Sequence, residues 1–198
     1  MHPKTRYNVR LAQRRGVVVE QAEADATTLA TFYALLQETA RRNEFTVKPL
    51  GYYEDYLRYL ADETVLLFAH TKEGVAAGLI MTCFGTEAIY RFGASSSERR
   101  VTGATAYLQY EAMRRARARG CTRYDLWGIP RKDPPPLSGN NLPGSRGGDW
   151  QGLYHFKVGF GGDIVTNPPP LEQHYPARRY PERLWRALRQ AWGAGKDR

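Results

Sequence analysis

The stretch Val65-Leu-Leu-Phe-Ala-His-Thr-Lys-Glu-Gly-Val-Ala-Ala-Gly-Leu-Ile-Met-Thr-Cys-Phe84 decides the fold of this chain. It contains two apolar runs, 65–69 and 75–84, separated by a turn sequence, His-Thr-Lys-Glu-Gly. A further run, 88–94, follows after Gly-Thr-Glu, so the pattern predicts consecutive strands joined by tight turns. Because the central residues of these runs are apolar on both faces, we expect helices to cover the sheet.

Helical patterns precede these strands. A short basic helix over 5–15 is expected to end at Gly16, because glycine readily adopts the left-handed conformation that closes a helix. The β-branched run 17–20 follows, and Asp25 is a candidate cap for the next helix. An amphipathic helix over 53–60 leads into the strands.

After the strands, a helix over 102–119 is expected to stop at Gly120. It leads to a fifth strand over 124–127, which a helical crossover places parallel to an earlier strand. The remaining predicted segments are a long loop over 131–149, a final strand over 163–166 and a basic amphipathic helix over 181–192. The element order predicts one α/β domain spanning 1–198, with a mixed central sheet flanked by helices.

The composition limits the class of protein. The chain has 198 residues, is 42% hydrophobic and contains no apolar run long enough to span a bilayer. Its start lacks an apolar signal core, and Cys83 and Cys121 suit reduced thiols, so we expect a cytoplasmic protein. Neither cysteine has metal-ligand spacing to a second one, so the sequence predicts no zinc site, and we expect no cofactor.

The charge of the chain is strongly positive. The net charge is +9, which favours anionic partners such as nucleic acid, nucleotide-linked substrates or an acidic membrane surface. Arg6, Arg10 and Arg14 follow one another at a spacing of four, so a helix places the three guanidinium groups along one face. We interpret this face as a candidate track for phosphates of a nucleic acid, with a solvated basic surface as the alternative.

One lysine stands out after the long loop. The segment Gly152-Leu-Tyr-His-Phe-Lys-Val-Gly-Phe-Gly-Gly162 sets Lys157 among aromatic residues and glycines. An ammonium is strongly hydrated and seldom accepted by a core without a partner. Glycines let backbone approach a ligand closely, and aromatic rings provide a rigid wall. These residue types alone favour a surface turn with an exposed lysine, but the rest of the sequence reverses this preference, and we expect Lys157 to face an open groove.

Several segments occur together in an order that is similar to a known family. They are Lys4-Thr-Arg-Tyr-Asn-Val-Arg-Leu-Ala12, Tyr90-Arg-Phe-Gly-Ala-Ser-Ser96, Tyr107-Leu-Gln-Tyr-Glu-Ala112, Gly120-Cys-Thr-Arg-Tyr-Asp-Leu-Trp-Gly-Ile-Pro130 and the lysine segment itself. Together they resemble the Fem family of aminoacyl-tRNA-dependent peptidyltransferases, which build the interpeptide bridge of peptidoglycan. The resemblance covers nearly the whole chain, and the lysine segment is its most specific part.

This resemblance implies a Gcn5-related N-acetyltransferase-like fold that uses aminoacyl-tRNA instead of acetyl-CoA. Members of the family move an amino acid from tRNA to the stem peptide of a muropeptide precursor, which is lipid-linked or UDP-linked. They usually carry two such domains, and this chain resembles the second one, with 1–16 similar to the helix that links the two. A separate chain supplying the first domain is therefore a possible partner.

The resemblance also implies roles for individual residues. Lys157 is the candidate catalytic residue, which stabilises negative charge near the 3′ end of the tRNA, with Phe156 and Tyr154 beside it as substrate-binding residues. Lys48 and Tyr52 match a motif that holds the anionic part of the precursor, although the family has arginine where this chain has Lys48. A capping loop with a surface lysine explains Lys48 equally well.

Strand residues complete the set of candidates. Tyr90 and Phe92 are expected to line the same groove as the precursor motif, or alternatively to be core aromatics. Asp125 lies at the end of a central strand of the predicted sheet, where open sheets place ligands, but a structural hydrogen bond explains it equally well.

Two other functions remain open from the sequence. Arg100-Val-Thr-Gly-Ala-Thr105 partly matches the pyrophosphate loop of acetyl-CoA-dependent relatives, which leaves an acyl-CoA-dependent N-acyltransferase as an alternative. A basic tRNA-binding module without activity is a second alternative, based on the arginine clusters. The apolar residues of the predicted helix 181–192 suit packing or peripheral contact with an anionic membrane, and we favour packing.

Overall fold

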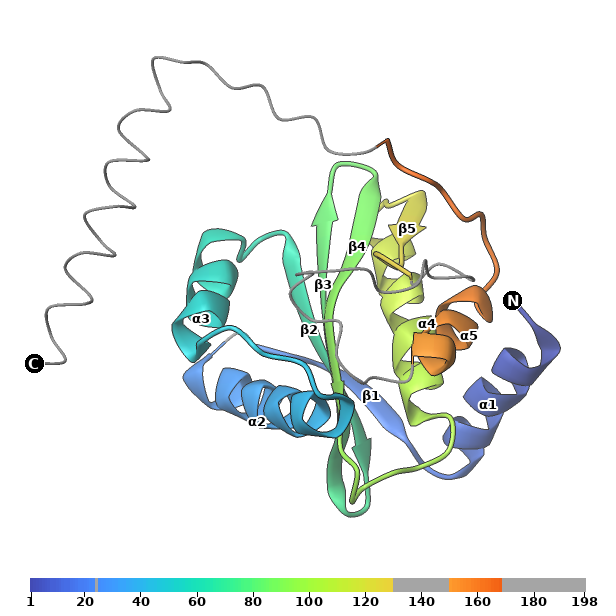
Figure 1. Ribbon diagram of the computed structural model, residues 1–198, viewed down its shortest axis with the longest axis horizontal. Helices are drawn as coiled ribbons and strands as arrows, with labels where there is room; N and C mark the ends of the chain where they lie inside the picture. The colour runs from blue at the N-terminus through green and yellow to red at the C-terminus, as the bar shows by residue number, and fades with distance from the viewer. Residues whose placement is uncertain (24, 130–149, 169–198) are drawn as a thin grey trace, which may run out of the picture. The chain divides into compact units, whose positions relative to one another are not determined.

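The structure is a computed structural model, shown in Figure 1. It describes residues 1–23, 25–129 and 150–168. Most of these residues belong to a compact unit, Met1–Gly162, and a second unit, Asp163–Arg198, is described only over 163–168.

Three predictions concern the later part of the chain. The predicted loop over 131–149 and the predicted helix over 181–192 lie outside the described residues. The predicted strand over 163–166 is wrong, because these exposed residues have no regular secondary structure. The single domain over 1–198 stays a prediction.

A mixed five-stranded sheet forms the centre of the first unit, in the order β1-β2-β3-β4-β5. The strands are β1 (Val18–Ala22), β2 (Thr64–Thr71), β3 (Gly74–Phe84), β4 (Glu87–Ser95) and β5 (Arg123–Asp125). Neighbouring strands are antiparallel except β4 and β5, which are parallel. The predicted strands and the parallel fifth strand are therefore confirmed, but β5 lies at an end of the described sheet and not at its centre.

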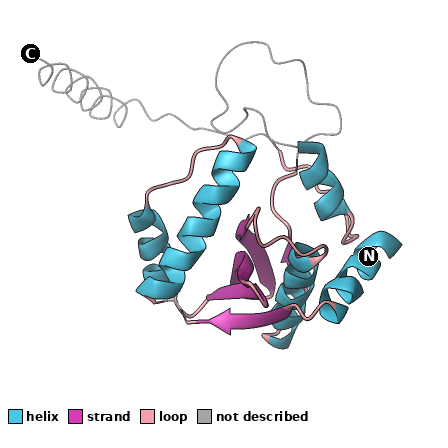
Figure 2. Cartoon of the chain, turned by 90° about the horizontal axis from the view of Figure 1, so that it is seen from below, coloured by secondary structure: helices cyan, strands magenta, loops and turns pink. Residues whose placement is uncertain are grey.

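Helices cover both faces of this sheet, as Figures 1 and 2 show. They are α1 (Pro3–Arg14), α2 (Ala26–Asn43), α3 (Leu50–Tyr59), α4 (Ala104–Ala118) and α5 (Trp150–Val158). In Figure 1, α2 and α3 lie on one side of the sheet, and α1, α4 and α5 lie on the other. The predicted α/β architecture with a covered mixed sheet is confirmed.

The alternation of side chains along the strands builds two apolar cores. On β2, Val65 and Leu67 point into the core under α4, whereas Leu66 and Phe68 point into the core under α2 and α3. Both faces of the central strands are thus removed from water, which explains why their sequence is continuously apolar.

The signals that end and begin helices act as expected. Gly16 and Gly120 have φ of 75° and 89° after α1 and α4, a conformation that glycine adopts without steric cost. The Asp25 side chain accepts a hydrogen bond of 2.8 Å from the Thr28 backbone N–H and caps α2.

The start of α4 lies directly against α1. Gly103 precedes α4 with φ of 90°, and a Cβ atom added there would be 2.1 Å from the backbone oxygen of Asn8. No side chain fits in this space, so glycine is required both for the backbone angle and for the close contact between the two helices.

This contact predicts a large difference between two glycine substitutions. In Gly120→Ala the new Cβ meets no atom within 4 Å, so the free energy of unfolding falls only by the cost of the left-handed backbone, about 1–2 kcal/mol. Gly103→Ala has the same backbone cost and also pushes α1 away from α4, so we expect its free energy of unfolding to fall by a further amount of about 1–3 kcal/mol. Urea unfolding of both variants measures the difference, and equal losses would contradict the contact.

Candidate functional site

The strands β4 and β5 pair over a short distance and then separate. Their parallel ladder runs only from Glu87 with Arg123 to Ile89 with Asp125. β4 continues to Ser95, and within the described part of the chain no strand pairs with this edge of it beyond Ile89. The opening between the two strands is where the lysine of the sequence analysis lies.

Lys157 is buried at this opening, with 6% of its surface exposed. Its Nζ donates a hydrogen bond of 2.7 Å to the backbone oxygen of Gly128, in the turn after β5. The same Nζ lies 5.6 Å from the centre of the Tyr90 ring on β4. Lys157 therefore reaches the expected region of the sheet, but it is covered there and does not face an open groove.

The surroundings of Lys157 change its acidity. Burial disfavours the ammonium and lowers the pKa of Lys157 to about 8, although the negative charge of Asp125 acts in the opposite direction. A neutral amine is thus accessible near physiological pH, while the cation still dominates at pH 7. Such a displaced pKa in a buried lysine is typical of functional sites.

Two tyrosines lie beneath this opening. Removal from water raises the pKa of the Tyr90 hydroxyl to about 12. Burial also raises the pKa of Tyr124 on β5, whose oxygen accepts a hydrogen bond of 2.6 Å from the amide nitrogen of the buried Gln109. Both hydroxyls therefore remain neutral and do not compensate the charge of Lys157.

Apolar packing holds α5 in place. Phe156 packs with Phe160 at a ring distance of 5.3 Å, in a cluster that joins α5 to Val9 of α1 and Ala106 of α4. Because successive helical residues point about 100° apart, Phe156 anchors the helix while Lys157 points toward Tyr90. Tyr154 lies one turn earlier on α5, half-buried beside His155.

Gly159 of the lysine segment lies against other parts of the chain. A Cβ atom added to Gly159 would be 2.6 Å from Thr5 Oγ1, and the backbone oxygen of Gly159 accepts a hydrogen bond of 2.8 Å from the His2 N–H. We expected close approach of a ligand here, but the described neighbours of Gly159 are the first turn of α1 and α5 itself.

A β-bulge in β4 separates two predicted partners. Ile80 pairs with Phe92 and Met81 pairs with Tyr90, so Arg91 is an extra residue on β4. Tyr90 consequently packs with the core under α4, and Phe92 packs with the core under α2 and α3. The expectation that Tyr90 and Phe92 line the same side is wrong, because the bulge reverses the alternation between them.

The precursor motif lies on the side of Phe92. Lys48 is exposed just before α3, and its backbone oxygen accepts a hydrogen bond of 3.2 Å from the Tyr33 hydroxyl. Tyr52 is 39% exposed and makes an edge contact with Phe92, with ring centres 6.4 Å apart. The residues predicted to bind or act on the precursor and donor ester thus form two groups, Lys48, Tyr52 and Phe92 on one side and Lys157 with Tyr90 on the other.

Two residues that the sequence analysis missed lie between these groups. Cζ of Arg91 is 4.5 Å from the centre of the Trp127 ring and 5.3 Å from that of Phe92. Trp127 lies two residues after the end of β5. Its N–H donates a hydrogen bond of 2.7 Å to the Asp125 carboxylate, so Asp125 has the structural role that the sequence left open. A strand arginine between two aromatic residues was the only sequence signal.

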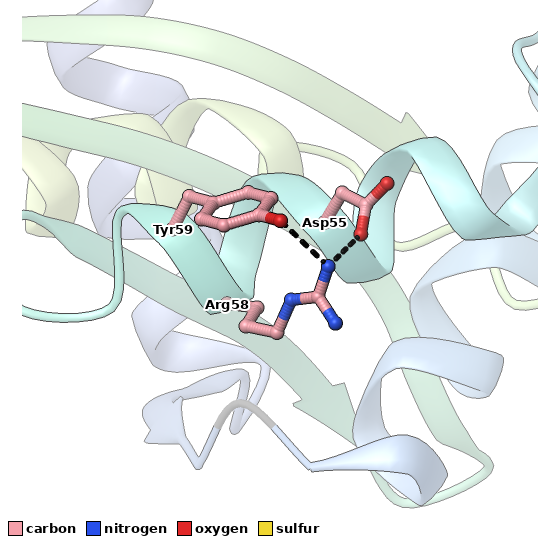
Figure 3. Close-up of polar contacts among 3 residues, drawn as sticks. All are labelled: Asp55, Arg58 and Tyr59. Atoms are coloured by element: carbon pink, nitrogen blue, oxygen red, sulfur yellow. Dashed lines mark hydrogen bonds and ion pairs between the residues drawn. The ribbon is translucent and has the colours of Figure 1, made fainter.

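A second stacked arginine on α3 differs from Arg91. Figure 3 shows Arg58 bonded to the carboxylate of Asp55 at 2.6 Å and to the hydroxyl of Tyr59 at 3.0 Å. These side chains are exposed, so the pair adds little to stability. Arg58 is therefore a neutralised surface arginine.

The arginines of α1 share one face, as predicted. Arg6, Arg10 and Arg14 are exposed and line an open hollow of about 700 Å³ together with Pro3, Tyr7 and Gln13. No helix in the described part of the chain combines the length and apolar character that crossing a membrane requires.

The family of the chain follows from its sequence and fold. A family model described as an acetyltransferase (GNAT) domain matches residues 3–136. The chain belongs to this family. The Gcn5-related acetyltransferase fold predicted from the sequence is therefore confirmed, and the family supports an acyltransferase.

Solved structures share the fold at low identity. FemX is 21% identical with a TM-score of 0.61 over 67% of this chain, and the chain spans 50% of FemX. The C-terminal domain of a putative lysylphosphatidylglycerol synthetase from Agrobacterium fabrum is 13% identical with a TM-score of 0.50, covering 65% of this chain and 41% of that one. No curated protein matches in sequence.

A second kind of neighbour has the size of this chain. An aminoglycoside acetyltransferase from an uncultured soil metagenomic sample, in complex with sisomicin, is 11% identical with a TM-score of 0.54. The match covers 79% of this chain and 97% of that one. At such identities these likenesses show the fold alone.

The lowered pKa of Lys157 predicts a pH-dependent stability. Between about pH 8 and pH 10.5 the unfolded chain keeps a proton that the folded chain has lost, so stability rises with pH in this window. Relative to Lys157→Met, the wild-type free energy of unfolding should increase by about 1–2 kcal/mol from pH 7.5 to 9.5. Urea titrations at both pH values measure it.

The control is Lys72→Met in the exposed turn between β2 and β3, which should show no such difference from the wild type. A wild-type stability that changes with pH in parallel with that of Lys157→Met would mean that Lys157 titrates like an exposed lysine.

Proposed function

We propose that this chain is an aminoacyltransferase of the Fem type, which transfers an amino acid from aminoacyl-tRNA to the stem peptide of a peptidoglycan precursor. The observation that supports this most is Lys157, which lies in the Fem-like segment and is buried where β4 and β5 separate. The family membership and the likeness to FemX support the acyl-transfer chemistry on this fold.

The reaction requires little covalent chemistry from the protein. The acceptor amine attacks the ester carbonyl carbon of the donor, forming the C–N bond, and the C–O bond to the terminal ribose breaks. The proton lost by the amine ends on the ribose hydroxyl that leaves. The protein accelerates this exchange by holding the two substrates together and by stabilising the oxyanion of the tetrahedral intermediate.

Lys157 supplies the charge for that oxyanion. Among the described residues, Lys157 Nζ donates one hydrogen bond, to Gly128, which uses one of its three N–H donors; uncovering of this buried ammonium on substrate binding would present the other two to the intermediate. With a pKa of about 8, roughly nine in ten molecules carry the cation at pH 7. Because Lys157 is removed from water, a charge beside it is worth more than at the surface.

The acceptor and the nucleic acid have candidate surfaces of their own. Lys48 and Tyr52 are exposed at the start of α3 and remain the proposed contacts for the anionic part of the precursor. Arg6, Arg10 and Arg14 line a hollow that suits the phosphates of the tRNA donor. The chain spans half of FemX, so a separate chain that completes the precursor site is part of the proposal.

An acyl-CoA-dependent N-acyltransferase is the second candidate, because structures of acetyltransferases match the chain over nearly their whole length. One contact argues against it. The backbone oxygen of Asn8 on α1 lies against Gly103, within the partial pyrophosphate motif of this chain, so an anion at this helix start would meet a partial negative charge on that side. A diphosphate needs open N–H groups at such a helix start.

Transfer kinetics test the role of Lys157. We expect Lys157→Met to lower turnover from aminoacyl-tRNA about 10²–10³-fold and to leave KM nearly unchanged, because the charge acts on the intermediate. The wild-type to variant ratio of turnover should fall as pH rises through about 8, since the lysine becomes neutral. The acceptor amine titrates in the same way with both proteins, so its effect on turnover cancels in this ratio.

Lys72→Met is the matched control and should behave as the wild type. Lys157→Arg keeps a cation at high pH, so the turnover that this variant retains, relative to Lys157→Met, should not fall as pH rises through about 8. A ratio that rises through pH 8 would instead make Lys157 a base, and an unchanged turnover in Lys157→Met would remove it from the mechanism.

RNA binding tests the donor. Changing Arg6, Arg10 and Arg14 together to Gln should weaken binding of tRNA and reduce the slope of log K against log salt by about 2–3, because up to three phosphate contacts are lost. The matched control changes three exposed cations elsewhere, Arg41, Arg58 and Lys72, and should keep the slope. Fluorescence anisotropy with labelled tRNA measures both.

Calorimetry with acetyl-CoA completes this experiment. Micromolar binding of acetyl-CoA by a protein that does not bind tRNA would overturn the proposed donor in favour of the second candidate.

A further inference from the structure

Arg91 is held in place, but it has no anionic partner among the residues that the structure describes. The β4 bulge sets it between the rings of Trp127 and Phe92, at 4.5 Å and 5.3 Å. The described residues give its guanidinium neither a carboxylate in an ion pair nor a side-chain hydrogen bond. Stacking fixes the plane of an arginine and leaves the N–H donors at its edge available.

Trp127 is exposed and adopts an unusual backbone conformation. Half of its surface, 50%, is open to water, and its φ is 64°, a left-handed angle that bulky residues rarely adopt. The carboxylate of Asp125 maintains this turn by accepting the Trp127 N–H. A large apolar ring held outward at a cost in backbone energy points to a function outside the fold itself.

Arg91 and Trp127 adjoin the residues that hold Lys157. Tyr90, whose ring lies under the Lys157 ammonium, precedes Arg91, and Gly128, whose oxygen binds that ammonium, follows Trp127. The same two segments therefore carry the buried lysine and the stacked pair. On the other side, Phe92 continues the row to the exposed Tyr52.

We propose that Arg91 and Trp127 form a binding site for an anionic group of a substrate, a phosphate or a carboxylate, and hold that group next to Lys157. The planar guanidinium fork matches the paired oxygens of either group, and the Trp127 ring offers a flat surface for the atoms attached to it. This inference rests on the proposed function only for the origin of the anionic group, which is a phosphodiester of the donor or a carboxylate of the acceptor peptide.

Direct binding by the full chain tests the site. The probes are 5′-AMP and pyrophosphate for the phosphate, and a short lysyl peptide as free acid or as C-terminal amide for the carboxylate. Calorimetry gives the affinities at fixed low salt. NMR of the tryptophan indole N–H groups, with Trp127 assigned through Trp127→Phe, reports whether the ligand lies beside this ring.

We expect Arg91→Gln to lower the affinity for the bound probe about tenfold or more, because a charged hydrogen bond is lost. Arg91→Lys keeps the charge but loses the planar guanidinium fork and its stacking, so its affinity for the probe should fall less than that of Arg91→Gln. Trp127→Asn should also weaken binding, and since asparagine tolerates a left-handed angle, its melting temperature should not fall. The matched control is Arg58→Gln, a stacked arginine already paired with Asp55.

The two classes of probe identify the source. Binding of 5′-AMP and pyrophosphate that depends on Arg91 assigns the donor phosphate, and binding of the free acid but not the amide assigns the acceptor carboxylate. The inference is overturned if no probe shifts the Trp127 signal, if Arg91→Gln binds as the wild type does, or if Arg58→Gln weakens binding equally.

Transfer assays on the same variants separate this inference from the proposed function. Anion binding that depends on Arg91, in a chain that transfers nothing from aminoacyl-tRNA, keeps the site and rejects the function. Normal transfer with an unchanged KM in Arg91→Gln keeps the function and rejects the site.

Discussion

The arrangement of this site depends on placing one ammonium group in a largely dry environment. Lys157 loses most of its hydration and receives in return the Gly128 carbonyl, the face of Tyr90 and the more distant charge of Asp125. These contacts do not fully replace water, so the pKa of Lys157 remains low. Because α5 carries the lysine and these contacts come from β4, β5 and the turn after β5, the pKa of Lys157 depends on how all of these elements are placed.

Helix α1 contributes to this arrangement through its contacts with α4 and α5 as well as through its positive charge. His2 bonds to the backbone of Gly159 at the end of α5, Asn8 contacts Gly103 at the start of α4, and Val9 joins the cluster that contains Phe160. One face of α1 thus fixes both helices on its side of the sheet. The opposite face leaves its arginines exposed over an open hollow.

The sequence predicted the fold better than the site, for physical reasons. Strands, caps and the parallel crossover depend on local patterns, such as the apolar run 65–69 and the glycine after α4. The bulge at Arg91 depends on how β3 and β4 pair, which no local pattern encodes, and it separated Tyr90 from Phe92. The left-handed Trp127 was equally invisible, since tryptophan gives no signal for that angle. Lys157 was found through a resemblance, and its burial only through the structure.

The distribution of cations follows from how the helices pack. An acyltransferase with a polyanionic donor needs positive charge or open N–H groups along the path of that donor. Here the backbone oxygen of Asn8 lies against Gly103, so the start of α4 faces a hydrogen-bond acceptor of α1 on that side. Cations are placed elsewhere: Lys157 beneath the opening between β4 and β5, Arg91 at the bulge beside it, and the three arginines on α1. The donor proposed for this chain has charge that extends over a larger surface than a single diphosphate, and it would meet cations at all three of these places.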